Sequence, residues 1–315
     1  MSPKGPSSSK SDRPVGADIG APPLVVGIGE LLWDLLPDGR QMGGAPANFA
    51  YHARALGAAS MIVSAVGDDR PGREILEALG HRGLKRSGIA VVSGAPTGTV
   101  TVALDAGGVP RYTIHEGVAW DVIPWTAGIA GLAARADAVC FGSLAQRSPV
   151  SRATIGAFLD ATRPDCLRVL DLNLRQSYFG RETVRSLLGR ANVLKLNDEE
   201  LTTVAGLLSL PGPEDRVLAG LLEAHRLFLI ALTKGPSGSR LFGPGVDLST
   251  PGRPVETADT VGAGDAFTAV LVTGMLRHMG WEEIGERANR VAAYVCSRKG
   301  AWPKLPAELA AWTRP

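Results

Sequence analysis

The stretch Asp259-Thr260-Val261-Gly262-Ala263-Gly264-Asp265 leads directly into the mostly apolar run Ala266-Phe267-Thr268-Ala269-Val270-Leu271. Glycines in a short loop, followed by an uncharged run, predict a tight turn that opens a buried helix. The first amide N–H groups of such a helix have no partner within it, and the helix dipole makes this end positive. The stretch therefore predicts a site for phosphate or for developing negative charge.

Asp265 stands at this predicted helix start, where its carboxylate would repel a bound anion. The arrangement makes chemical sense if Asp265 is a general base that takes a proton from a hydroxyl while the amides stabilise the group being transferred. The alternative is that Asp265 is a helix N-cap, a position that Asp often occupies. The stretch by itself leaves both interpretations open.

The composition is that of a globular protein, with 45% hydrophobic and 20% charged residues in 315. A net charge of +2 argues against recruitment of nucleic acid or of an anionic membrane, and no apolar run is long enough to span a bilayer. Three scattered cysteines without metal-ligand spacing favour a reducing, cytoplasmic location. Residues 1–23 are rich in Ser, Pro and Gly and are expected to form a disordered tail.

Strands and helices alternate along most of the chain. Apolar runs that predict strands begin near Leu24, Met61, Ala138, Leu167, Asn192 and Leu227, and helical segments separate most of them. This alternation predicts an α/β fold with a mostly parallel central sheet covered by helices on both faces. Ligands of such sheets bind beyond the carboxyl ends of the strands.

Two regions, residues 30–42 and 97–115, interrupt this alternation. The first contains a second strand and a turn at Pro37-Asp38-Gly39, and the second contains two half-buried strands around the turn Asp105-Ala106-Gly107-Gly108. We expect these strands to form a small separate sheet that acts as a lid over the site. A surface hairpin without function is the alternative, and the same sheet could also pair with its copy in a homodimer.

Polar residues gather where the predicted strands end. Asp171, Asn173 and Arg175 follow one strand, Asn197 and Glu200 follow another, and the glycine-containing segment from Thr233 to Gly238 follows a third and could cradle phosphate. Structural roles remain open for some of them, because Asn197 and Glu200 also match a capping box and Arg175 could be a surface charge.

The segment Gly43-Gly44-Ala45-Pro46-Ala47-Asn48 opens another predicted helix, with Pro46 suited to its first turn. The double glycine lets the backbone approach a ligand closely, and Asn48 offers both a donor and an acceptor. Asn48 in a capping network is the alternative.

Two other nucleotide-binding patterns fit poorly. Gly27-Ile28-Gly29 follows a strand as in dinucleotide-binding proteins, but Leu32 stands at the third glycine position, which argues against an NAD-dependent enzyme. The chain also lacks a Walker-type loop, so phosphate must be held otherwise.

Three blocks together resemble the ribokinase-like, or PfkB, carbohydrate kinases: Gly43-Gly44-Ala45-Pro46-Ala47-Asn48, Asn197-x-x-Glu200, and Asp259 to Asp265. The resemblance spans about residues 24 to 306. Within the family it is closest to bacterial-type fructokinases, through Gly29-Glu30-Leu31-Leu32-Trp33-Asp34, Ala45-Pro46 and Asp171-Leu172-Asn173-Leu174-Arg175. It implies a ribokinase-like kinase domain over residues 24–315, with strands of the lid within about 30–42 and 97–115.

The resemblance also implies roles for individual residues. Asp265 would be the general base, and the amides of Gly262, Ala263 and Gly264 would form the anion hole. The sugar would be held by Asp34, Gly43, Gly44, Asn48 and Arg175. ATP would contact Thr233, Gly235 and Gly238 through its phosphates, with Asn197 beside them and Asn289 near the adenine. Glu200 would organise Mg²⁺ through water, and a K⁺ site would involve Asp259, Val261, Val295, Arg298 and Gly300.

The leading hypothesis is an ATP-dependent fructokinase that phosphorylates a terminal hydroxyl of fructose. A kinase for another sugar or a sugar acid such as 2-keto-3-deoxygluconate remains open, because the block ending in Arg175 occurs in both groups. A catalytically silent relative that binds nucleotide is a further alternative, although a pure binder has no need of Asp265.

Overall fold

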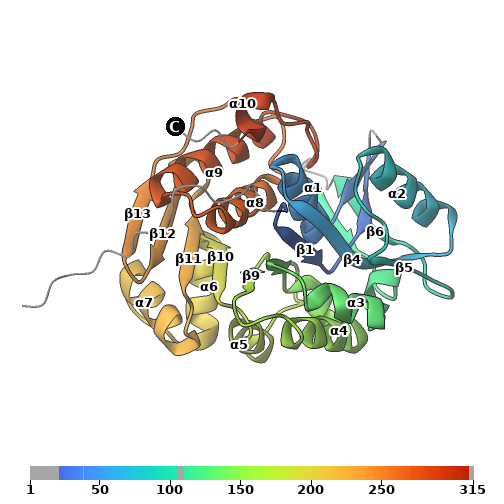
Figure 1. Ribbon diagram of the computed structural model, residues 1–315, viewed down its shortest axis with the longest axis horizontal. Coiled ribbons are helices and arrows are strands. Elements are labelled where there is room, and N and C mark those ends of the chain that lie inside the picture. Colours follow the sequence, from blue (N-terminus) through green and yellow to red (C-terminus); the bar gives the residue numbers. More distant parts are fainter. Residues whose placement is uncertain (1–20, 38, 105–109, 312–315) are drawn as a thin grey trace, which may run out of the picture.

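The computed structural model describes residues 21–37, 39–104 and 110–311. Most of the expected tail, residues 1–20, and the expected turn at 105–109 lie outside these ranges. The main sheet has the strand order β13-β12-β11-β10-β9-β8-β1-β4-β5 (Figure 1). All neighbours pair in parallel except β11 with β12 and β12 with β13, which are antiparallel. The strands are β1 (Leu24–Ile28), β4 (Ala59–Gly67), β5 (Ile89–Val92), β8 (Ala138–Phe141), β9 (Leu167–Asp171), β10 (Val193–Asn197), β11 (Leu229–Thr233), β12 (Ser239–Gly243) and β13 (Val246–Thr250).

Helices cover both faces of this sheet, as the alternation predicts. One face packs against α3 (Ala127–Ala133), α4 (Pro149–Asp160), α5 (Arg181–Leu188), α6 (Asp198–Leu208) and α7 (Glu214–His225). The other face packs against α1 (Ala45–Ala55), α8 (Ala263–Leu276), α9 (Trp281–Cys296) and the short α10 (Ala307–Ala310). A third cluster, around Leu31 and Ile75, packs α2 (Arg70–His81) against β4.

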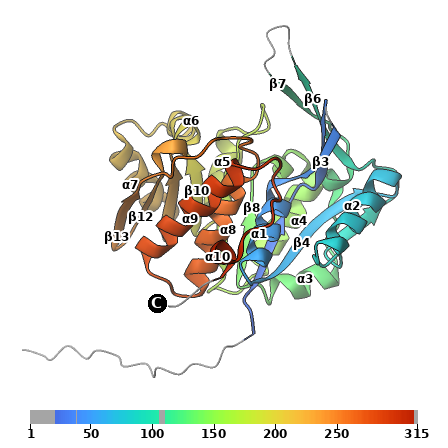
Figure 2. The ribbon, with the colours of Figure 1, turned by 90° about the horizontal axis from the view of Figure 1, so that it is seen from above.

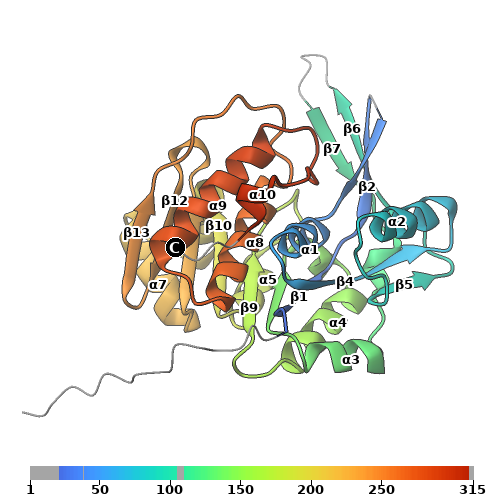
Figure 3. The same ribbon diagram turned by 45° about the horizontal axis from the view of Figure 1, so that its top comes forward.

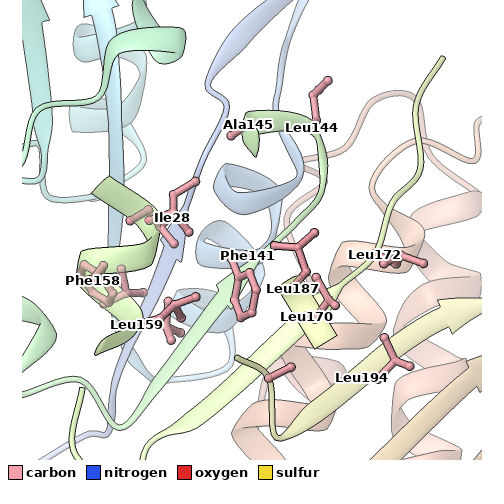
Figure 4. Packing of buried hydrophobic residues seen from close by; sticks show 14 of the residues in the cluster. Ile28, Phe141, Leu144, Ala145, Phe158, Leu159, Leu170, Leu172, Leu187 and Leu194 are labelled. Atoms are coloured by element: carbon pink, nitrogen blue, oxygen red, sulfur yellow. The ribbon is translucent and has the colours of Figure 1, made fainter. Parts of the chain in front are cut away.

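The strands are apolar on both faces because both faces are covered. In β1, Val26 and Ile28 face the α4 side with Phe141 and Leu170, whereas Val25 belongs to the cluster on the α8 side. Figure 4 shows Ile28, Phe141, Leu170 and Leu194 of successive strands packed against Phe158 and Leu159 of α4 and Leu187 of α5. Continuous apolar strands thus hold the carboxyl ends of β1, β8, β9 and β10 in a fixed row.

A second, smaller sheet has the order β3-β2-β6-β7 and projects from the body (Figure 2). Its strands are β2 (Leu32–Leu36), β3 (Gly39–Gly43), β6 (Gly98–Leu104) and β7 (Pro110–Ile114). At Gly98, which pairs with Leu32, an added Cβ would lie 2.3 Å from Nε1 of Trp120. The small sheet expected from the interrupted alternation is confirmed, and it is anchored to the body through this close contact.

Helix α8 lies centrally on its face, between α1 and α9 (Figure 3). Nine consecutive residues, from Ala266 to Gly274, are buried. A helix that is apolar all round must be surrounded by protein, so the predicted buried helix is confirmed. Its first turn opens at the row of strand ends.

Several elements were not predicted. The strand β5, the helices α3 and α7 and the antiparallel hairpin β12–β13 lack the continuous apolar runs of the central strands, since each is only partly buried. The Pro-rich segment after Ala301 also contains a short helix, α10, at Ala307–Ala310. Its Leu309 is buried against the α9 side of the core, which stabilises this short turn.

None of the helices within the described ranges is long and apolar enough to cross a membrane.

Candidate active site

The first turn of α8 begins at a glycine in the left-handed region. Gly262 is the N-cap with φ 79°, and no side chain caps the helix. An added Cβ there would lie 2.6 Å from Cβ of Ala301, so the segment after α9 packs directly on this turn. The amide of Ala263 donates a 3.3 Å hydrogen bond to the carbonyl of Thr260 in the preceding loop. The helix start therefore presents backbone amides to the strand ends without an intervening side-chain cap.

Asp265 is not the N-cap of α8, because Gly262 occupies that position and Asp265 lies one turn further on. Its Oδ2 accepts a hydrogen bond of 2.8 Å from Nδ2 of Asn48 on α1. The Oδ1 of Asn48 in turn accepts a 2.6 Å hydrogen bond from Nε1 of Trp302. Trp302 stacks on Tyr51 with ring centroids 4.7 Å apart. The carboxylate is thus fixed by a chain of side chains and does not cap its own helix.

The environment of Asp265 favours its protonated form. Burial raises the pKa of its carboxyl to about 7, and the nearby Asp171 carboxylate acts in the same direction. The hydrogen bond from Asn48 and the charges of Lys195 and Arg175 act in the opposite direction. A carboxylate with a pKa near neutrality is suited to take up a proton during a reaction at pH 7.

Gly43 and Gly44 bring the backbone close to Asp34 of β2 and to Glu30. An added Cβ at Gly43 would lie 2.2 Å from Oδ2 of Asp34, and one at Gly44, with φ 112°, would lie 2.3 Å from the carbonyl oxygen of Glu30. The buried Glu30 accepts a 3.2 Å hydrogen bond from the amide of Ala45 at the start of α1. Only glycine fits at these two positions.

Arg175 interacts electrostatically with both Asp34 and Asp265. Burial raises the pKa of Asp34 to about 6, and the Asp259 carboxylate adds to this, whereas the charge of Arg175 lowers it. The charge of Arg175 also acts to lower the pKa of Glu30 and of Asp265. Arg175 is exposed, and its Nη1 donates to the adjacent carbonyl of Leu174 at 3.1 Å. The charge of Arg175 therefore acts on three carboxyl groups that are distant from one another in the sequence.

The residues predicted to contact nucleotide lie at the ends of β10 and β11. Thr233 ends β11, and the loop Gly235–Ser237 follows it. Gly238 has φ 102°, and an added Cβ would lie 2.1 Å from the carbonyl oxygen of Thr250. That carbonyl also accepts a 3.1 Å hydrogen bond from Nδ2 of the buried Asn289 on α9. Asn289 and Gly238 thus hold the same stretch of backbone.

Asn197 and Glu200 form the capping box of α6. Asn197 Oδ1 accepts from the amide of Glu200 at 2.8 Å, and Glu200 Oε2 accepts from the amide of Asn197 at 2.9 Å. The other oxygen of Glu200 accepts a 2.9 Å hydrogen bond from the amide of Leu174. The structural interpretation of this block is confirmed, and it ties α6 to the loop that carries Arg175.

Comparison with known protein families gives a clear result. Residues 38–308 match the pfkB family of carbohydrate kinases, which is most of the chain. The chain belongs to this family. The kinase is 31% identical over 308 residues to the uncharacterized sugar kinase PH1459 of Pyrococcus horikoshii, covering 89% of this chain and 92% of the relative. It is 30% identical over 300 residues to a fructokinase of Klebsiella pneumoniae, covering 89% of this chain and 95% of that relative.

Solved structures agree on the fold of the kinase. PH1459 in complex with ATP superimposes with a TM-score of 0.72 at 29% identity, covering 88% of this chain and 94% of that one. A fructokinase from Xylella fastidiosa with bound ATP gives a TM-score of 0.79 at 22% identity, covering 90% of this chain and 95% of that one, which supports the fold alone. The ribokinase-like architecture and the sugar-kinase class expected from the sequence are therefore confirmed.

The resemblance implies two ion sites, and the side chains near each of them show which kind of binding they fit. Within the described residues, no group of three or more His, Cys, Asp or Glu side chains converges to hold a metal. Both oxygens of Glu200 are used by backbone amides, and the side chain is buried. The residues at this position therefore fit an ion organised through water better than one bound directly by Glu200.

The loop implied for a monovalent ion is held by Asp259. Its two oxygens accept from the amides of Val261 and Gly300, each at 3.0 Å. Val295 is fully buried among apolar residues, and its carbonyl accepts a 3.0 Å hydrogen bond from the amide of Arg298. Such a loop fits an ion bound by backbone carbonyls, with Asp259 shaping the loop.

Two residues that matter to this kinase were not singled out from the sequence. Trp302 lies in the Pro-rich segment after α9, and its contact with Asn48 spans 254 positions. Lys195 lies inside an apolar strand, where its buried ammonium donates to Asp171 Oδ1 at 3.0 Å. A lysine within an otherwise apolar predicted strand was the available signal for the second.

Proposed function

We propose that this pfkB kinase transfers the γ-phosphate of ATP to the terminal hydroxyl of fructose, with Asp265 as the general base. The observation that carries the proposal is the buried Asp265 carboxylate, held by Asn48 at the uncapped start of α8. A base at a helix start that no side chain caps suits proton removal from a hydroxyl together with stabilisation of a transferring phosphoryl group. The fructokinase of Klebsiella pneumoniae, 30% identical, favours fructose as the substrate.

The reaction places different demands on the residues around Asp265. Asp265 accepts the proton of the sugar hydroxyl as that oxygen attacks phosphorus, and the amides of Gly262, Ala263 and Gly264 stabilise charge on the transferred group. Asp34, Asn48 and Arg175, with the close backbone at Gly43 and Gly44, orient the sugar. One N–H of Asn48 remains for a ligand after its bond to Asp265, because an amide carries two donors.

The nucleotide is expected on the other side of the anion hole. Thr233, Gly235 and Gly238 would contact the phosphates, with Asn197 beside them. Asn289 would shape the backbone near the adenine. ATP bound to the 29%-identical PH1459 supports this half of the proposal. Mg²⁺, organised through water by Glu200, would neutralise charge on the phosphates when bound. The loop around Asp259, Val261, Val295, Arg298 and Gly300 would hold K⁺ beside the anion hole.

The small sheet is proposed to act as a lid. Asp34, which is proposed to bind the sugar, lies on β2 of this sheet. The loop after β9 contacts the same sheet, since Nε2 of Gln176 donates to the carbonyl of Tyr112 at 2.9 Å. Closure over the sugar would exclude water, which competes with the sugar as phosphoryl acceptor.

One observation favours a second candidate, a sugar acid such as 2-keto-3-deoxygluconate. Arg175 is exposed beside the predicted sugar site, and its one hydrogen bond among the described contacts goes to the adjacent backbone carbonyl of Leu174. A free guanidinium of this kind matches a substrate carboxylate.

The test is ADP release from MgATP across fructose, ribose, 2-keto-3-deoxygluconate, glucose and nucleosides. We expect strong turnover with fructose and little with the others. Turnover with the sugar acid in place of fructose would select the second candidate. Silence with every acceptor, while ATP still raises the Tm, would contradict both candidates.

A further inference from the structure

A buried ion pair lies directly behind the start of α8. The ammonium of Lys195 on β10 donates to Oδ1 of Asp171 on β9 at 3.0 Å, and the exposed fractions of the two side chains are 9% and 4%. A buried ion pair usually stabilises a protein no better than apolar residues of the same size. Its place at the site therefore suggests a role in the reaction rather than in stability.

We propose that Lys195 and Asp171 are a positioning pair for Asp265, in which Asp171 holds α8 through Thr268 and Lys195 offsets the negative charge gathered around the base. This inference rests on the proposed role of Asp265 as the base.

Asp171 contacts α8 through Thr268, which lies in the second turn of the helix. Its Oδ2 accepts a 2.8 Å hydrogen bond from Oγ1 of Thr268. Thr268 lies one turn after Gly264, and the same hydroxyl is 3.0 Å from the carbonyl oxygen of Gly264. Both oxygens of Asp171 are therefore used, one by the cation and one by the helix that carries the base.

The ammonium of Lys195 touches the first turn of α8. An added Cβ at Gly264 would lie 2.8 Å from Nζ of Lys195. The absence of a side chain at Gly264 thus lets the cation approach the backbone between the anion hole and Asp265. Lys195 and Asp171 together contact the first two turns of α8.

The charges around Asp265 are unbalanced without Lys195. Asp171 on β9 acts on Asp265 from one side, and Lys195 itself interacts with Asp171, Glu200 and Asp265. Two further groups interact with the charge of Asp265: Arg175 after β9, which is exposed, and the buried thiol of Cys140 on β8. Burial alone lowers the pKa of Lys195, but the three carboxylates outweigh burial and raise it, so the ammonium stays charged.

Removing either Lys195 or Asp171 is expected to shift the pKa of Asp265 in a defined direction. Without the positive charge of Lys195 the ionised form of Asp265 is less favourable, so its pKa rises. Without the negative charge of Asp171 the ionised form is more favourable, so its pKa falls. A charge within about 4 to 6 Å shifts a neighbouring pKa by about 1 to 3 units.

The experiment measures kcat/KM against pH for the full-length kinase with MgATP and its best acceptor sugar. The acidic limb of the kcat/KM profile is expected to move up by about 1 pH unit in Lys195→Met and down by about the same amount in Asp171→Asn. In Lys195→Arg, which keeps the positive charge, this limb is expected to stay in place. The double variant, which removes both charges, is expected to return close to the wild-type limb. Limbs that stay in place in both single variants, or that move in the same direction, would overturn the proposal.

A second measurement does not depend on the sugar. For wild type and for each variant, the Tm is measured with and without an additional Asp265→Asn substitution, in the absence of ligands and at a series of pH values. The midpoint of the Tm difference against pH is expected to move up in Lys195→Met and down in Asp171→Asn. If no sugar in the panel is phosphorylated but the midpoints move, the proposed function fails and the positioning pair stands. Unmoved midpoints overturn the pair whatever the substrate. If Lys195→Met does not fold, Asp171→Asn and the double variant decide in the same way.

Discussion

The raised pKa of Asp265 predicts that this carboxyl destabilises the folded protein at neutral and alkaline pH. Between about pH 4 and pH 7 the folded protein retains a proton that the unfolded chain has released. The free energy of unfolding therefore falls as the pH rises through this window and levels off above it. Asp265→Asn removes the charge, keeps the size of the side chain and can still bond to Asn48 after an amide flip, so the variant escapes this loss.

The magnitude follows from the two pKa values. The difference between about 7 in the folded protein and 3.8 for an ordinary Asp corresponds to about 4 kcal/mol at pH 8 and about 2 kcal/mol at pH 5. For a chain of this length 1 kcal/mol shifts the Tm by about 2 °C. The variant is therefore expected to melt about 8 °C higher than wild type at pH 8, and this gain should shrink by about half at pH 5.

Thermal unfolding followed by circular dichroism, without ligands and at constant ionic strength from pH 5 to pH 8, measures this gain. Asp165→Asn is the matched control, because it makes the same substitution at a side chain that is 75% exposed. A gain for Asp265→Asn that is the same at pH 5 and pH 8 would refute the reasoning, since it would mean that burial does not shift the titration of this carboxyl.

Four further outcomes are expected. Asp265→Asn should abolish ADP release while leaving the Kd for nucleotide nearly unchanged in calorimetry; comparable turnover would remove Asp265 from the role of base. Glu200→Gln should shift the magnesium titration of activity to higher concentration and cost about 1 kcal/mol of stability, because one acceptor of the capping box is lost; an unchanged titration would count against its role. Gly238→Ala should raise the KM for ATP more than the KM for sugar, because the added Cβ would lie 2.1 Å from the carbonyl oxygen of Thr250; equal effects on both would argue against a nucleotide site there. Gly98→Ala should cost about 1 to 3 kcal/mol in chemical denaturation and raise the KM for sugar, since the lid strand must move away from Trp120; wild-type values would show that this contact does not anchor the lid.

The sequence was sufficient for the architecture because the central strands carry a simple signal. Val25, Val26 and Ile28 are fully buried, and continuous apolar runs of this kind occur in sheets covered on both faces. The edge hairpin β12–β13 was missed because its short strands carry few buried residues, three of ten, and lie at the border of the sheet. Short, half-buried elements give too weak a pattern to separate from loops.

The site was predictable only where a local backbone requirement coincides with chemistry. Gly262 to Asp265 form a contiguous stretch, so the helix start and its carboxylate could be recognised together. The contacts that hold the carboxylate join α1, α8 and the segment after α9, across 217 and 254 positions of sequence. Such pairings depend on how the layers pack, which no local pattern encodes.

The contact of Trp302 with Asn48 gives the kinase an optical probe of its own chemistry. The indole N–H donates to Asn48, and the amide of Asn48 donates to Asp265, so a chromophore lies one side chain away from the proposed base. Tryptophan emission responds to hydrogen bonding at the indole nitrogen and to nearby charge. Ionisation of Asp265 and arrival of a ligand at Asn48 should therefore both change the emission, and a difference spectrum against Trp302→Phe isolates the signal. The state of the site can be followed in solution without a label.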